Sequence, residues 1–106
     1  LFRSGDYLPL DAQGTCSGHV VTFARNRSGL WALVVVPRFL SALVQEGQFP
    51  LGRDVWQDTT VALPSGAPRT WRNVFTQETV NCATDLAVAD TLAHFPVALL
   101  IGKAIP

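Results

Sequence analysis

The chain has 106 residues, a length that favours one domain with its own hydrophobic core. Hydrophobic residues make up 48% of the sequence and charged residues only 15%, against about 25% in an average domain, so we expect part of the surface to contact another protein. Eight basic residues balance eight acidic ones, and this zero net charge gives no electrostatic reason to expect nucleic acid or a membrane as a partner.

The first predicted strand is residues 7–10, at the edge of a sheet because its proline cannot donate a ladder hydrogen bond. After a polar loop over 11–18, a β-hairpin forms the centre of the predicted fold. Its strands are expected at 20–24 and 30–36, joined by a turn at 26–29. The second strand carries no polar side chain, which predicts burial on both faces, and seven residues are too few to cross a bilayer.

The second half of the chain predicts shorter elements separated by turns that contain proline and glycine. Apolar residues at helical spacing predict one or two helical turns over 39–44, and a loop follows at 48–54. Asp90 is expected to cap a single helical turn over 91–94. The remaining strands are expected at 56–63, 70–75, 79–81, 86–88 and 97–101.

Together these elements predict an all-β fold, a mostly antiparallel β-sandwich of about seven or eight short strands with one or two short helical turns. No predicted helix is long enough to connect parallel strands in a βαβ unit. We expect residues 1–106 to form a single β-domain without internal repeats. The chain has no methionine and begins at Leu1, which we interpret as a sign that it is a piece of a larger protein.

No catalytic residue and no cofactor are predicted. The carboxylates stand at turns or strand ends beside Gly, Pro, Ser or Thr, where turn formation and capping explain them, whereas a catalytic acid needs a built pocket. The sequence has no glycine-rich phosphate loop and no nucleophile elbow. No local signature supports a Cys–His nucleophile either.

The spacing of cysteine and histidine bears on whether the chain binds a metal. Cys16 and His19 have a Cys-x-x-His spacing, and Cys82 and His94 are the remaining ligands of these types. Structural zinc sites usually show two short paired spacings, and the second pair is missing here, so we expect no metal. Two cysteines are not a disulfide framework, and we expect both to be free thiols, as in intracellular proteins.

The tryptophans leave two alternatives open. Trp31 lies in the most apolar predicted strand, and we expect it to be buried. Trp56 and Trp71 lie near polar turns. They are expected to pack in the core or against a neighbouring domain, and the alternative is that they bind substrate on a carbohydrate-binding face, where planar rings stack on sugars.

Seven stretches of the chain resemble, in order and spacing, the extreme C-terminal region of the maltooligosyltrehalose synthase family, which belongs to the α-amylase superfamily. They are FRSGDYLPL (2–10), HVVTFAR (19–25), VVVPR (34–38), WQDT (56–59), LP (63–64), WRNV (71–74) and FPVALL (95–100). The resemblance covers nearly the whole chain. One departure is Gln77, where we expect Gly in many relatives, and it predicts a looser turn at 76–78.

This resemblance implies the C-terminal β-domain of a larger cytoplasmic enzyme whose catalytic (β/α)8 barrel precedes it. Such an enzyme, a glucosylmutase of trehalose biosynthesis, converts the reducing-end α-1,4 linkage of a maltooligosaccharide into an α,α-1,1 linkage. The family's catalytic Asp, Glu and second Asp lie on barrel loops, outside this sequence. The expectation is therefore a non-catalytic domain that packs on and stabilises the barrel of its own parent chain. A carbohydrate-binding module for α-glucan is the alternative, and a free-standing hydrolase is a weaker third hypothesis.

Overall fold

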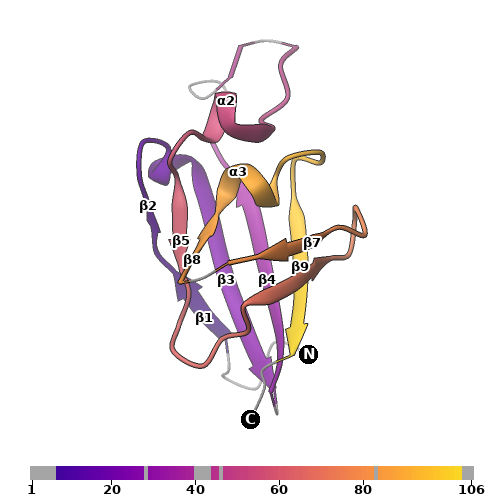
Figure 1. The fold of residues 1–106 in the computed structure, drawn as a ribbon. Helices are drawn as coiled ribbons and strands as arrows, with labels where there is room; N and C mark the ends of the chain where they lie inside the picture. The colour runs from indigo at the N-terminus through magenta and orange to yellow at the C-terminus, as the bar shows by residue number, and fades with distance from the viewer. Residues whose placement is uncertain (1–6, 28, 40–43, 46, 83, 104–106) are drawn as a thin grey trace.

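The computed structural model describes residues 7–27, 29–39, 44–45, 47–82 and 84–103. Within them the chain forms nine strands in two antiparallel sheets, with short helices at one end (Figure 1). Six strands pair in the order β1-β3-β4-β9-β6-β7, and three pair in the order β2-β5-β8. The predicted all-β, mostly antiparallel, sandwich-like architecture is confirmed.

The elements have the following bounds. The large sheet contains β1 (Tyr7–Leu10), β3 (Val20–Arg27), β4 (Leu30–Pro37), β6 (Thr70–Asn73), β7 (Thr79–Asn81) and β9 (Ala98–Lys103). The small sheet contains β2 (Ala12–Gln13), β5 (Thr60–Ala62) and β8 (Asp85–Ala87). The helices are the 3-10 turn η1 (Ser17–His19), α2 (Gly52–Trp56) and α3 (Val88–Thr91).

The β3–β4 hairpin lies at the centre of the large sheet, as the sequence predicts. Its register runs from Val20 opposite Pro37 to Arg27 opposite Leu30. The first strand is three residues longer than predicted, so the four-residue turn at 26–29 is wrong and only two residues link the strands. Gly29 adopts a φ of 85°, a conformation that costs glycine little, and its N–H donates to the side chain of Asn26.

Strand β4 is buried on one face and half-buried on the other, which corrects the prediction of a strand buried on both faces. Trp31, Leu33 and Val35 are at most 4% exposed, whereas Val34 and Val36 are half-buried on the opposite side. Buried residues of β5, β8 and both α-helices belong to the same core cluster as Trp31, Leu33 and Val35, and Ala12 of β2 packs against that cluster. All these elements therefore cover one face of the large sheet, here called the inner face.

The segment around Trp56 differs most from the prediction. The strand expected at 56–63 is wrong at its start, because Trp56 ends helix α2 and β5 covers only Thr60–Ala62. Helix α2 also includes residues 52–54 of the loop expected at 48–54. Val55 and Trp56 are both buried, and the indole N–H of Trp56 donates to the carbonyl of Pro50 at 2.7 Å. A strand would send these two side chains to opposite faces, while one helical turn sends both toward the core.

Smaller corrections concern the other short elements. The polar loop expected at 11–18 contains strand β2 and the turn η1. Asp90 lies inside helix α3, whose N-cap is Ala87, so it is not the expected cap. The helical turns expected over 39–44 fall mostly outside the described residues. None of the described helices is long and apolar enough to cross a membrane.

The core joins all three tryptophans. Trp31, Trp56 and Trp71 belong to one buried cluster, which also contains aliphatic residues from both sheets. Burial of these three indole rings helps to stabilise this small sandwich, because aromatic side chains bury the largest areas. The remaining large members of the cluster are Leu33, Val35, Val61, Leu86, Val88, Leu92 and Leu100.

Candidate functional site

The outer face of the large sheet, opposite the inner face, is a broad apolar surface. The strand register aligns its side chains in rows across β3, β4 and β9. One row contains Phe23, Val34 and Leu99, and the next contains Ala32 and Ile101 beside the buried Arg25. Val21 and Val36 form a third row. We call these seven apolar residues the apolar outer face.

The side chains of the apolar outer face are less covered than those of the inner face. Val21 is 37% exposed, and the other six are half-buried, although they lie on the central strands of the sheet. On the inner face of the same strands, Leu33, Val35 and Leu100 are fully buried. Apolar side chains that stay partly open to water in this way make the face a candidate interaction surface.

Basic residues border the apolar outer face at one end. Arg27 and Lys103 lie opposite Leu30 in the row at the end of the β3–β4 hairpin. Arg72 of β6 lies opposite Ile101. All three side chains are exposed, and we call them the basic border. No Asp or Glu occupies a described strand position on this face.

Trp56 and Trp71, the candidate sugar-binding residues, are buried. Trp56 is 0% exposed and Trp71 is 1% exposed. A sugar platform needs rings with a free face, and neither indole has one, so this geometry fits core packing and not the carbohydrate-binding alternative. Trp71 is buried because side chains alternate between the two faces of β6, so that Trp71 and Asn73 point inward and Arg72 points outward.

A different aromatic pair is exposed, and the sequence analysis missed it. The rings of Phe75 and Phe95 have centroids 5.5 Å apart, and they are 52% and 43% exposed. Beside them the Nδ1 atom of His94 lies 2.8 Å from a carboxylate oxygen of Glu78. The pair joins the turn after β6 to the segment before β9. Phe75 lies at the end of the strand expected at 70–75 and Phe95 directly follows the helical turn expected over 91–94, so neither position predicts contact between the two rings.

The expected looser turn at 76–78 is instead closed by several hydrogen bonds. Gln77 has a φ of 66°, the left-handed region that favours glycine. Its backbone N–H donates to the carbonyl of Asn73, and its side chain donates to the carbonyl of Val74 and accepts from Arg72. These bonds compensate for the strained backbone that a glycine would adopt freely.

The two cysteines are free thiols in different surroundings. Cys16 is buried, and its thiol donates to the carbonyl of Val55 at 3.3 Å. Cys82 is half-buried beside Trp71. Burial raises the pKa of the Cys82 thiol, while the Trp71 indole and the Arg69 charge act in the opposite direction. Among the described residues no three His, Cys, Asp or Glu side chains are placed to hold a metal ion.

Asp58 and Asp90 are both engaged by other residues of the chain. Asp58 accepts hydrogen bonds from the backbone N–H of Thr15 at 2.9 Å and from its hydroxyl at 2.8 Å. These bonds hold the pKa of the Asp58 carboxyl below its usual value. Asp90 lies 3.9 Å from Arg53 in an exposed pair. None of these acids faces a second carboxylate across a cleft, as a glycosidase would require.

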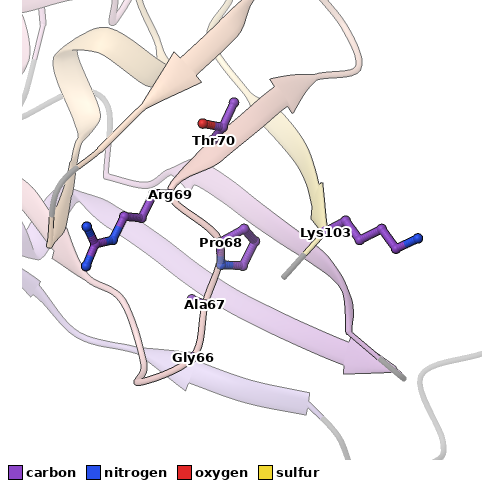
Figure 2. Close-up of a pocket in the computed structure, with 6 residues that line it drawn as sticks. All are labelled: Gly66, Ala67, Pro68, Arg69, Thr70 and Lys103. Carbon is purple, nitrogen blue, oxygen red and sulfur yellow. The ribbon is translucent and has the colours of Figure 1, made fainter. Parts of the chain in front are cut away.

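Two pockets of the described structure are open hollows around the turn at 66–69. One has a volume of about 370 Å³ and is lined by Gly66, Ala67, Pro68, Arg69, Thr70 and Lys103. Figure 2 shows the Arg69 and Lys103 side chains extending in opposite directions, so their charges do not converge on one ligand. A neighbouring hollow of about 270 Å³ includes Cys82 and Thr84. These hollows lack the converging polar groups of a small-molecule site.

The apolar outer face with its basic border is thus the candidate functional surface of the described structure. It can bury apolar area against another protein, and its basic residues can pair with carboxylates. Comparisons with protein-family models, with curated proteins and with solved structures found no match.

Proposed function

We propose that this chain is the non-catalytic C-terminal β-domain of a cytoplasmic enzyme similar to maltooligosyltrehalose synthase, and that it packs on and stabilises that enzyme's catalytic barrel. The observation that carries the proposal is the order of the seven resembling stretches across residues 2–100. Under this proposal the parent enzyme acts on maltooligosaccharides, and the domain contributes no chemistry of its own.

The apolar outer face supports this proposal. Apolar surface that is removed from water stabilises a complex by about 25 cal/mol per Å². The face offers branched aliphatic side chains on rigid strands, which is the kind of surface that packs against another domain. A domain that only needed to be soluble would place polar side chains at Val34, Val36 and Leu99.

The absence of a catalytic arrangement among the described residues fits the same role. Asp58 accepts hydrogen bonds from the distant Thr15, Asp90 faces Arg53, and Glu78 faces His94. Each of these carboxylates therefore has a partner within the chain, and its position is explained without a substrate. The chemistry of the proposed parent enzyme would then depend entirely on residues outside this chain.

The proposal is tested by expressing the longest reading frame that encodes this chain and incubating the protein with maltopentaose. We expect a non-reducing product with a terminal trehalosyl unit. The control is the same protein ending before Leu1, which we expect to be less stable to heat. A trehalosyl product from the 106-residue chain alone, or none from the longer protein, would contradict the proposal.

A carbohydrate-binding module remains the second candidate, on one observation. The exposed Phe75–Phe95 pair lies beside the planar polar groups of Glu78 and His94, and rings flanked by such groups can stack on sugars. Its rings are tilted by 41° to each other, which suits a flat chain of glucose units less well than coplanar rings. Titration with a maltooligosaccharide tests this candidate, as described in the Discussion.

A further inference from the structure

The indole N–H of Trp71 has no hydrogen-bond partner among the described residues. The side chain is only 1% exposed, so bulk water does not reach this donor. Buried indole N–H groups usually find an acceptor, as that of Trp56 does at the carbonyl of Pro50. Trp71 therefore brings to the core a donor for which the unmodified chain supplies no acceptor.

The sulfur of Cys82 lies beside this donor. The backbone N–H of Cys82 donates to the carbonyl of Arg69 at 2.9 Å, and this bond continues the β6–β7 pairing in which Trp71 lies opposite Val80. Cys82 follows Val80 by two positions, so it shares the face of Trp71 and is its diagonal neighbour, within reach of an aromatic side chain. The thiol lies 3.6 Å from the carbonyl oxygen of Arg69, which fixes its position.

An open hollow reaches Cys82 from the outside. The hollow of about 270 Å³ is lined by the turn at 63–69 together with Cys82 and Thr84. It holds no converging polar groups, but a small oxidant needs only a path to the sulfur. Cys16, by contrast, is buried and lines neither of the two hollows.

Oxidation of the thiol would supply the missing acceptor. A thiol sulfur accepts hydrogen bonds only weakly, which leaves the Trp71 donor poorly satisfied. The first oxidation product of a cysteine is a sulfenic acid, in which an oxygen atom is bonded to the sulfur. On Cys82 this oxygen lies one bond beyond Sγ, where the indole N–H of Trp71 can donate to it.

We propose that Cys82 is a site of reversible oxidation by hydrogen peroxide, and that the indole N–H of Trp71 holds the resulting sulfenic acid by a hydrogen bond. This modification site is independent of the proposed function. The Cys82 thiolate attacks one peroxide oxygen, an S–O bond forms, and the O–O bond breaks. The other oxygen leaves as hydroxide and takes up the proton that the thiol released, which gives water. The sulfur loses two electrons, and the peroxide gains them.

The surroundings of Cys82 favour a lasting product over a fast reaction. Burial raises the pKa of the thiol, the Trp71 indole and the Arg69 charge oppose this shift, and the Asp85 charge adds to it. Because the thiolate is the nucleophile, attack on peroxide is slow near neutral pH and becomes faster as the pH rises. A small thiol reverses the oxidation: it forms a mixed disulfide with release of water, and a second thiol then frees Cys82.

The direct test treats the folded 106-residue chain with hydrogen peroxide and traps sulfenic acid with dimedone. Peptide mass spectrometry should find the dimedone adduct at Cys82 and none at the buried Cys16, which is the internal control. Incubation with a small thiol before the dimedone should prevent the adduct. The proposal fails if Cys82 gives no adduct, or if both cysteines are labelled equally.

A Trp71→Phe variant removes the N–H group and keeps a buried ring. The lifetime of the sulfenic acid is measured by varying the delay between peroxide removal and dimedone addition. It should shorten several-fold in this variant, while the rate at which peroxide consumes the thiol changes much less. The matched control is Trp56→Phe, because the indole N–H of Trp56 already donates to Pro50. Equal lifetimes in both variants and the parent sequence would overturn the proposal.

A second measurement on the parent sequence applies even if Trp71→Phe fails to fold. The chain has three tryptophans, so its two-dimensional proton–nitrogen NMR spectrum should contain three indole N–H signals. Peroxide should move the signal of Trp71 downfield, as a new hydrogen bond does, and leave the other two in place. The Cys82→Ala variant should show no such shift. Oxidation of Cys82 that leaves the Trp71 signal unmoved would contradict the proposed hydrogen bond and overturn the site.

Discussion

The ring of Trp71 occupies the space that a side chain on Gly102 would fill. A Cβ atom built on Gly102 would lie 3.0 Å from Cε3 of Trp71 and 2.7 Å from Cγ of Pro68. On the other side, Gly102 is opposite Trp31 in the pairing of β4 with β9. The bare backbone at this position therefore lets two tryptophans of the core approach the same strand.

The first prediction is that Gly102→Ala destabilises the domain. The added methyl group forces Pro68 and Trp71 to move, and overpacking of this kind costs about 1–3 kcal/mol. The free energy of unfolding in urea measures the effect. The matched control is Gly18→Ala, because a Cβ there meets nothing within 4 Å and surface changes stay within about 0.5 kcal/mol. Equal stability of the two variants would show that Trp71 does not pack against this strand.

The second prediction concerns the central strand. Trp31 is 4% exposed, so Trp31→Ala should cost about 3–5 kcal/mol in the free energy of urea unfolding. Leu30 is 55% exposed, and Leu30→Ala is the control that should cost far less. A loss below about 1 kcal/mol for Trp31→Ala would place the ring outside the core and contradict the assignment of β4.

The hairpin could be predicted because its second strand is an unbroken apolar run bounded by Gly29 and Pro37. The same run does not show which face of the strand is buried, because Val34 and Val36 on the outer side are as apolar as Leu33 and Val35 on the inner side. Burial on one side only depends on which elements pack there, and that is a property of the whole fold. The half-exposed outer face therefore appears only in the structure.

The helix at Gly52–Trp56 could not be predicted for a related reason. It has only two buried residues, Val55 and Trp56, too few for a periodic pattern. A hydrogen bond from the Cys16 thiol to the Val55 carbonyl ties the helix to a distant part of the chain, and the Trp56 indole donates to the nearby carbonyl of Pro50. The burial of Trp56 follows from this helix, while that of Trp71 follows from its register in β6.

The third prediction is a pH dependence at Asp58. The hydrogen bonds from Thr15 lower the pKa of this carboxyl in the folded state below its unfolded value of about 3.8. The bonds therefore contribute stability above that value, and the contribution is lost as the pH falls through the lower folded pKa. Asp58→Asn should reduce the free energy of unfolding near neutral pH, and its difference from the parent sequence should shrink in strong acid.

The matched control for this pH experiment is Asp90→Asn. Asp90 is exposed and lies 3.9 Å from Arg53, a distance at which surface pairs contribute little. A difference between Asp58→Asn and the parent sequence that stays constant from neutral pH to strong acid would contradict the role of the charged carboxylate in the Thr15 contact.

The fourth prediction concerns the thiols. Titration of the unfolded protein without reductant should find two free thiols, because the structure leaves Cys16 and Cys82 unbridged. In the folded protein the half-buried Cys82 should react before the buried Cys16. Because burial raises the pKa of the Cys82 thiol, the reaction of Cys82 with a disulfide reagent should reach its full rate at a higher pH than the reaction of a free thiol does. The Cys82→Ser variant should lack the faster phase of this reaction. The prediction would be refuted if the titration found no free thiol, or if the protein bound zinc in stoichiometric amount.

The last prediction separates an appended packing domain from a carbohydrate-binding module. Binding with a millimolar dissociation constant corresponds to only about −4 kcal/mol, so calorimetric titration with maltoheptaose must reach several millimolar. We expect no saturable heat, because Trp56 and Trp71 are buried and the exposed Phe75–Phe95 pair is tilted.

The control for this titration is Phe75→Ala with Phe95→Ala, which removes exposed rings. A saturable signal that disappears in this variant, with the urea midpoint retained, would assign the aromatic pair to glucan and favour the binding module. A signal that persists in the variant would show that the glucan binds elsewhere on the chain. It would contradict both the hypothesis that the Phe75–Phe95 pair binds glucan and the hypothesis that the domain serves only for packing. The absence of a signal in both proteins would agree with the expected packing role, because Trp56 and Trp71 are buried.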